Sequence, residues 1–88
     1  MCRNIRTLYN FAPPATDEEI RAASIQFIRK ITGFKKPSQM NEGAFEYAVN
    51  QVTLISKNLL TSLVTTASPR DRDIEALKAK ARAKLRFG

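Results

Sequence analysis

The sequence predicts an all-α fold, a small single-domain helical bundle with three main helices at about residues 17–31, 41–64 and 69–86. In each segment apolar residues recur at helical spacing, a capping residue stands at the start, and glycine or proline separates it from the next. A chain of 88 residues can build one core and is too short for two. We therefore expect one domain over residues 1–88, with residues 1–15 as an N-terminal arm packed on a bundle of residues 16–88.

The N-terminal arm is the least regular segment. Ile5, Leu8 and Phe11 lie three residues apart, a spacing that suits a helical turn, but Pro13-Pro14 keeps the following chain extended. We expect the arm to be irregular or to hold one short helical turn. It should pack across the bundle through these three apolar residues.

The first helix begins with a capping box. Thr16 and Glu19 have the spacing at which each side chain accepts a hydrogen bond from the backbone amide of the other residue. Gly33 should end the helix in the left-handed conformation that glycine adopts readily. The expected core face comprises Ile20, Ala23, Ser24, Phe27 and Ile31.

The second helix should be the long central element. Asn41 is a suitable N-cap, and a helix from there to about residue 64 would extend roughly 35 Å. Its apolar face is wide enough to contact two neighbours, as a central helix does. This face comprises Phe45, Ala48, Val49, Val52, Ile55, Leu59, Leu60 and Leu63.

The third helix should begin with Ser68 as N-cap and Pro69 at its first position. The connection over residues 65–67 is short, so we expect the second and third helices to form an antiparallel hairpin. The core stripe of the third helix would be Ile74, Leu77, Ala81 and Leu85.

Most of the formal net charge of +7 lies in the third helix. Residues 76–88 contain no acidic residue and five basic ones, which are Lys78, Lys80, Arg82, Lys84 and Arg86. This excess attracts polyanions, and nucleic acid is one interpretation. The other is a solvated flank, because bases near a helix C-terminus offset the macrodipole and these bases lie on both sides of the predicted core stripe.

The composition excludes several kinds of site. One cysteine, Cys2, and no histidine cannot build a structural zinc site or a histidine-assisted nucleophile. An enzyme would need Cys2, with a free amine beside its thiol after removal of Met1. Apolar runs are too short for a membrane span or a secretory signal. We expect a cytoplasmic protein that is not an enzyme and that has no cofactor, metal or membrane partner.

Candidate ligand or partner contacts lie in several polar places. The loop of residues 33–38 contains Phe34 and two lysines. Together these residues could bind an anion, or the lysines could simply be a solvated pair after the end of the helix. Apolar residues outside the expected core, including Tyr47 and Leu54, are a candidate partner surface with Ala22, Ile25 and the alanines at 76, 79 and 83. The polar candidates are Cys2, Arg3, Asn4, Lys35, Lys36, Arg70, Arg72, Lys78, Arg82 and Arg86.

Several stretches resemble a known family. They are Met1-Cys2-Arg3-Asn4-Ile5-Arg6-Thr7-Leu8, Pro13-Pro14-Ala15-Thr16-Asp17-Glu18-Glu19-Ile20-Arg21, Arg29-Lys30, Gly33-Phe34, Lys36-Pro37-Ser38, Ser62-Leu63-Val64-Thr65-Thr66-Ala67, Pro69-Arg70 and Arg86-Phe87-Gly88. The family is domain of unknown function 2277, a set of short, uncharacterised prokaryotic proteins. The resemblance implies an independently folding, mainly helical cytosolic protein, and it implies no reaction, ligand or catalytic residue.

The residues therefore favour a non-enzymatic binding or interaction module that contacts a protein partner or a second copy of itself. The alternative is non-specific nucleic-acid binding through the basic third helix. Salt separates the two, because polyanion binding weakens steeply with salt and an apolar interface does not.

Overall fold

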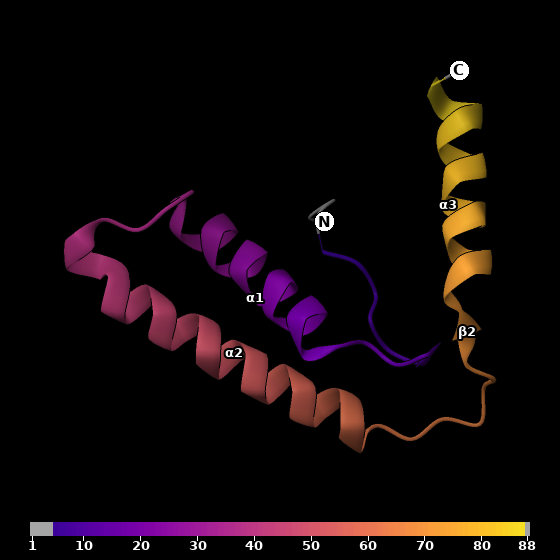
Figure 1. The fold of residues 1–88 in the computed structure, drawn as a ribbon, viewed down its shortest axis with the longest axis horizontal. Helices are drawn as coiled ribbons and strands as arrows, with labels where there is room; N and C mark the ends of the chain where they lie inside the picture. The colour runs from indigo at the N-terminus through magenta and orange to yellow at the C-terminus, as the bar shows by residue number, and fades with distance from the viewer. Residues whose placement is uncertain (1–4, 88) are drawn as a thin grey trace.

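The computed structural model describes residues 5–87, with side chains of the last helix as far as Leu85. Three helices dominate it, and the predicted all-α class is confirmed (Figure 1). The elements in chain order are β1 (Phe11–Ala12), α1 (Asp17–Thr32), the 3-10 turn η1 (Gln39–Asn41), α2 (Glu42–Ser62), β2 (Arg70–Asp71) and α3 (Arg72–Phe87).

Helices α1 and α2 lie side by side in opposite directions and form the core (Figure 1). Ile20 and Ile28 from α1 are buried with Val49 from α2. Ser24 is also buried, and its hydroxyl donates a hydrogen bond to the carbonyl of Ile20 at 2.9 Å. This bond satisfies the buried polar group within the helix.

The predicted core face of α1 is partly wrong. Phe27 and Ile31 remain 43% and 64% exposed, whereas Ile28, which the helical spacing did not single out, is buried. The reason is that α1 packs against α2 and the arm, whereas α3 contacts it only at its first turn through Glu19, so the buried face of α1 is narrow.

Local sequence signals fix the ends of α1 as predicted. The Thr16 hydroxyl accepts a hydrogen bond from the Glu19 amide at 3.1 Å, and the Thr16 amide donates to Oε1 of Glu19 at 3.0 Å. Gly33 has φ 77° and donates its amide to the Arg29 carbonyl. Asn41 stands at the N-cap position of α2, but it does not cap with its side chain. The preceding turn η1 gives Asn41 helical angles, and its Nδ2 donates to Oγ of Ser38 instead.

Helix α3 does not pack along α2 in the described part of the chain, and the predicted antiparallel hairpin is wrong (Figure 1). Residues 63–69 lead away from α2, and β2 then pairs in parallel with β1, with Phe11 beside Arg70 and Ala12 beside Asp71. This pairing ties the start of α3 to the arm and directs the helix away from the α1–α2 pair. The three helices therefore do not share one core.

Strand β2 also changes how α3 begins. The predicted cap residues Ser68 and Pro69 lie in the linker, because residues 70 and 71 are extended. Asp71 takes the capping role, since its Oδ1 accepts a hydrogen bond from the Ile74 amide at 3.0 Å.

The protruding helix makes the molecule flat and open, with extents of 43, 37 and 18 Å. The Cα radius of gyration is 15.6 Å, whereas a compact chain of this length has about 12 Å. Residues 5–10 of the arm contain no helical turn. Ile5 and Leu8 line an apolar groove of about 410 Å³ beside α1 and α2. No helix within residues 5–87 combines the length and the apolarity that crossing a bilayer requires.

Candidate functional site

The arm, the start of α1 and the start of α3 meet in a polar cluster that we call the junction: Asn10, Phe11, Glu19, Arg70 and Arg72. Asn10 holds the two chain segments together. Its carbonyl accepts a hydrogen bond from the Arg70 amide at 2.7 Å, and its Nδ2 donates to the carbonyls of Ser68 and Ala67 at 3.2 and 3.4 Å. Asn10 has φ 63°, a left-handed conformation that asparagine tolerates better than most residues.

A bidentate ion pair joins α3 to α1 within the junction. Nη1 and Nη2 of Arg72 donate to Oε2 and Oε1 of Glu19, each at 2.9 Å, and Nε donates to the Pro13 carbonyl at 2.7 Å. Planar guanidinium and carboxylate groups match well in this geometry. The carboxylate that caps α1 therefore also anchors α3.

This contact keeps Glu19 ionised in the acid range, below the ordinary pKa of a glutamate. Hydrogen bonds from the Arg72 side chain, and next from the Thr16 backbone, lower the pKa of Glu19 to about 2. The hydrogen bonds that Arg72 donates to Glu19 raise the pKa of Arg72 in turn. Both groups are thus charged at neutral pH, so Glu19 is a structural anion and is not suited to exchange protons as a general acid or base.

Phe11 completes the junction as an aromatic platform. The guanidinium carbons of Arg70 and Arg72 each lie 5.8 Å from the centre of its ring, within cation–π range. Arg72, a predicted ligand contact, thus directs its donors to groups of its own chain. Arg70 remains exposed.

A pocket of about 420 Å³ separates the arm from α3. Arg6 and Leu8 line it from the arm, Glu19 and Arg72 from the junction, and Ala76, Ala79 and Arg82 from α3. These contacts show which side of α3 faces the rest of the chain.

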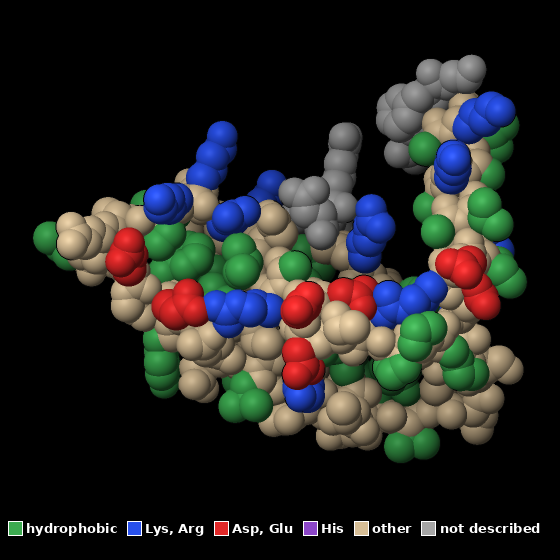
Figure 2. Space-filling view, viewed as in Figure 1, with side chains coloured by type: hydrophobic (Ala, Val, Ile, Leu, Met, Phe, Trp, Pro, Cys, Tyr) green, Lys and Arg blue, Asp and Glu red, His purple; other side chains and the backbone are tan. Residues whose placement is uncertain are grey.

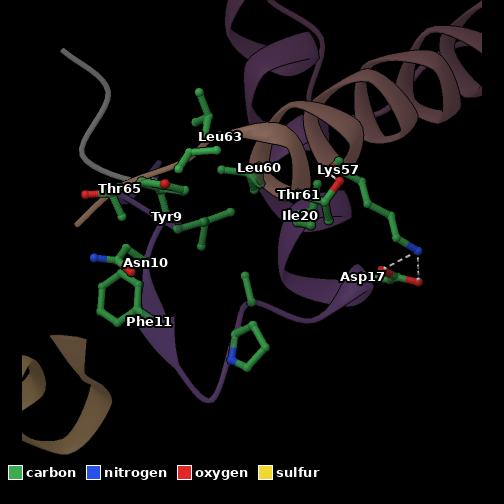
Figure 3. Close-up of a pocket in the computed structure, with 14 residues that line it drawn as sticks. Tyr9, Asn10, Phe11, Asp17, Ile20, Lys57, Leu60, Thr61, Leu63 and Thr65 are labelled. Carbon is green, nitrogen blue, oxygen red and sulfur yellow. Dashed lines mark hydrogen bonds and ion pairs between the residues drawn. The ribbon is translucent and has the colours of Figure 1, made fainter. Parts of the chain in front are cut away.

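A second pocket, of about 460 Å³, lies between the arm and the end of α2 (Figure 3). Its charged groups, Asp17 and Lys57, face each other at 3.1 Å and neutralise one another. In the part of the chain that the structure describes, no lining residue pairs a nucleophile with a base. Within that part, no group of three or more His, Cys, Asp or Glu residues could hold a metal ion either.

The exposed surface of α3 is amphipathic, and Figure 2 shows this helix standing clear of the rest of the molecule. Ile74, Leu77 and Leu85 are 53%, 65% and 89% exposed. The prediction that the basic residues of α3 flank a buried face is therefore wrong, because the apolar stripe between them is exposed to solvent. The exposed bases of α3 are Lys78, Lys80, Arg82 and Lys84.

Comparison with known proteins identifies a family whose description names no activity or ligand. The family model described as "Uncharacterized conserved protein (DUF2277)" matches residues 1–78. The chain belongs to this family. No curated protein and no solved structure matches it. The DUF2277 match includes the junction and ends inside α3 at Lys78, so Arg82 and Arg86 lie beyond it.

The structure does not gather the predicted contacts of this DUF2277 chain into one site. Lys35 and Lys36 are exposed in the α1–α2 connection, at the other end of α1 from the junction (Figure 1). Arg70 and Arg72 lie in the junction, and Lys78 and Arg82 lie farther along α3. Cys2, Arg3, Asn4 and the side chain of Arg86 lie outside the described residues.

Sequence reasoning did not single out Asn10, expected Phe11 only to pack on the bundle, and assigned Glu19 to capping alone. The nearest signal was an asparagine before an aromatic residue and two prolines, which favours a turn at Asn10. Nothing in that signal indicates its partners at residues 67–70.

Proposed function

We propose that this DUF2277 chain is a small, non-enzymatic interaction module of the cytoplasm that binds another protein chain through α3. One observation carries the proposal. The apolar stripe of α3 is exposed on a helix that the rest of the chain holds only at its start. A solitary helix of this length is marginal in water, and packing of an apolar face normally stabilises it.

The free energy available from burying the apolar stripe of α3 supports a partner that covers this face. Fully burying one large aliphatic side chain contributes roughly 1.5–3 kcal/mol. Ile74, Leu77 and Leu85 all lie on one face of α3, so a partner that covers this face gains from all three. The fixed start of α3 presents the face in a constant direction.

Cross-linking in cells tests this proposal. An amine-reactive cross-linker should join Lys80 or Lys84 of α3 to another protein chain, and mass spectrometry identifies the joined peptides. Leu77→Asp should lose these cross-links, because a carboxylate in the stripe prevents apolar packing. Met40→Asp places the same charge at a residue that is 92% exposed and distant from α3, and it should retain them. The proposal would be overturned by finding no cross-link to another protein and none between the same lysine of two copies, or by cross-links that persist in Leu77→Asp.

A second candidate function is non-specific nucleic-acid binding. The observation that favours it is the exposure of Lys78, Lys80, Arg82 and Lys84 on a helix in which no residue from 72 to 85 is buried. Fluorescence anisotropy of labelled duplex DNA and single-stranded RNA, at low and near-physiological salt, tests it. Binding should fall linearly in a log–log salt plot, with a slope set by the phosphate contacts.

Charge-matched variants assign any such binding to α3. The double change Lys80→Glu and Lys84→Glu should weaken it strongly, whereas Lys35→Glu with Lys36→Glu alters the net charge equally in a distant loop. Equal losses in both double variants would indicate a general charge effect and reject a nucleic-acid site on α3.

A further inference from the structure

We infer that the partner of α3 is a second copy of this chain, and that the two α3 helices pair antiparallel through Ile74, Leu77, Ala81 and Leu85. This inference rests on the proposed function and names its partner. It predicts a symmetric dimer in which each copy contributes the same surface.

The direction of the stripe allows a second copy to approach. Ala76, Ala79 and Arg82 line the pocket that faces the arm. At about 100° per residue, Ile74, Leu77, Ala81 and Leu85 lie on the opposite side of the helix. The stripe therefore faces outward, and no described part of the same chain lies in front of it.

The charge pattern of α3 selects a second copy in antiparallel orientation. The first turn is acidic, with Asp73 and Glu75, and the described charges that follow are all basic. An antiparallel copy places its basic half beside this acidic turn at both ends of the pair, and it also opposes the two helix dipoles. A parallel copy would set basic beside basic, so the sequence disfavours it.

The apolar and charged positions agree on one register. With Leu77 beside Ala81 of the partner subunit, Ile74 comes near Leu85 of the partner subunit and Asp73 near Lys84 of the partner subunit. Asp73 and Lys84 lie on the same flank of the stripe, whereas Glu75 and Arg82 lie toward the pocket that faces the arm, where Glu75 pairs with Lys78 of its own helix at 3.7 Å. In an antiparallel pair equivalent flanks meet, so Asp73 of each copy is brought beside Lys84 of the partner subunit. The small side chain of Ala81 leaves room for a leucine.

A charge-swap series in analytical ultracentrifugation tests this pairing. The interface is short, so we expect a dissociation constant on the order of micromolar or weaker. Asp73→Lys and Lys84→Asp should each weaken dimerisation several-fold, and the double variant should return to within about twofold of wild type. Asp73 and Lys84 are about 16 Å apart along one helix and cannot pair within a chain, so rescue requires a second copy.

The series contains its own control for net charge. Lys84→Asp lowers the positive charge of the chain, which would strengthen dimerisation if overall repulsion were the determining factor, whereas the proposed pairing predicts weakening. Leu77→Asp should abolish the dimer and Met40→Asp should leave it intact. Circular dichroism of each variant verifies that the helices form.

The outcomes separate this inference from the proposed function. A dimer with charge-swap rescue supports both. A monomeric wild type whose α3 still cross-links to a different protein overturns the second copy and leaves the proposed function standing. A dimer indifferent to Leu77→Asp, with no α3 cross-links, overturns both.

Discussion

Glu19 connects two distant parts of the chain through one carboxylate. It completes the cap of α1 and receives two hydrogen bonds from Arg72 at the start of α3. Its pKa of about 2 follows mainly from the Arg72 contact. Acid should therefore weaken the attachment of α3 and the start of α1 together.

The pH dependence has a definite sign. The pKa of Glu19 is lowered in the folded chain from its ordinary 4.5 to about 2, so the ionised carboxylate favours folding. Its contribution is fully present above pH 4.5 and is lost as the pH falls toward 2. Arg72→Ala should bring the pKa of Glu19 back toward 4.5 and flatten the loss of stability in this window.

An NMR titration of the Glu19 carboxyl carbon measures this pKa directly, and urea unfolding at several acid pH values follows the stability. Arg21→Ala is the matched control, because it removes an ion pair with Glu46 and leaves Glu19 untouched. A pKa that stays at about 2 in Arg72→Ala would contradict the assignment.

The two described glycines, one directly after α1 and one inside α2, should respond oppositely to alanine. A Cβ on Gly33 or Gly43 meets no atom within 4 Å, so the difference is one of backbone conformation. Gly33 has φ 77°, and Gly33→Ala should cost about 1 kcal/mol. Gly43 lies in the first turn of α2, and Gly43→Ala should stabilise by up to about 1 kcal/mol. Thermal unfolding of the two variants verifies this, and destabilisation by both would contradict it.

At the scale of the elements, the packing of α1 on α2 should determine stability. Ile28 is 5% exposed and Ile31, one turn further, is 64% exposed. Ile28→Val should cost about 0.5–1.5 kcal/mol, because it leaves a small gap in a buried contact. Ile31→Val should stay within about 0.5 kcal/mol of wild type. Denaturant unfolding compares the same substitution at both positions, and equal costs would place the core elsewhere.

The elements show where sequence reasoning succeeds. The capping box at Thr16 and the end at Gly33 were predicted because both signals act within four residues. The start of α3 was placed at residue 69 because Ser68-Pro69 is a good local start, but the partners of this segment lie almost sixty residues away. The exposed stripe of α3 has the spacing of a buried one, and spacing alone does not distinguish the two.

At the scale of the whole molecule, the junction determines where α3 points. Asn10→Ala loses two side-chain hydrogen bonds and places alanine at a left-handed φ. The Arg70 amide, which donates to the Asn10 carbonyl, should then exchange its hydrogen at least about tenfold faster. Amides of the α1–α2 core should be unaffected.

Asn10→Gly separates the loss of the side-chain hydrogen bonds from the effect of the left-handed backbone, because glycine tolerates this conformation and lacks the side-chain amide group. It should show an intermediate exchange rate at Arg70. Faster exchange throughout α1 and α2 would instead mean that the junction and the core unfold as one unit.

The candidate site was only partly predictable, because its contacts join residues that are far apart in the sequence. Arg70 and Arg72 were singled out as candidate ligand or partner contacts, but they contact Phe11, Glu19 and Pro13, which no local pattern connects with them. Their partners depend on the parallel pairing of two short strands. Two residues on each side are too few to give a recognisable strand pattern.

The attachment of α3 at one end makes it a lever. The helix extends about 24 Å from its base, so a tilt of about 10° at Arg72 would move its tip by about 4 Å. That displacement approaches the rise of a full helical turn and is large enough to change which side chains meet in an interface. Substitutions at Asn10 or Glu19 should therefore alter association at the far end of α3, with every interface residue unchanged.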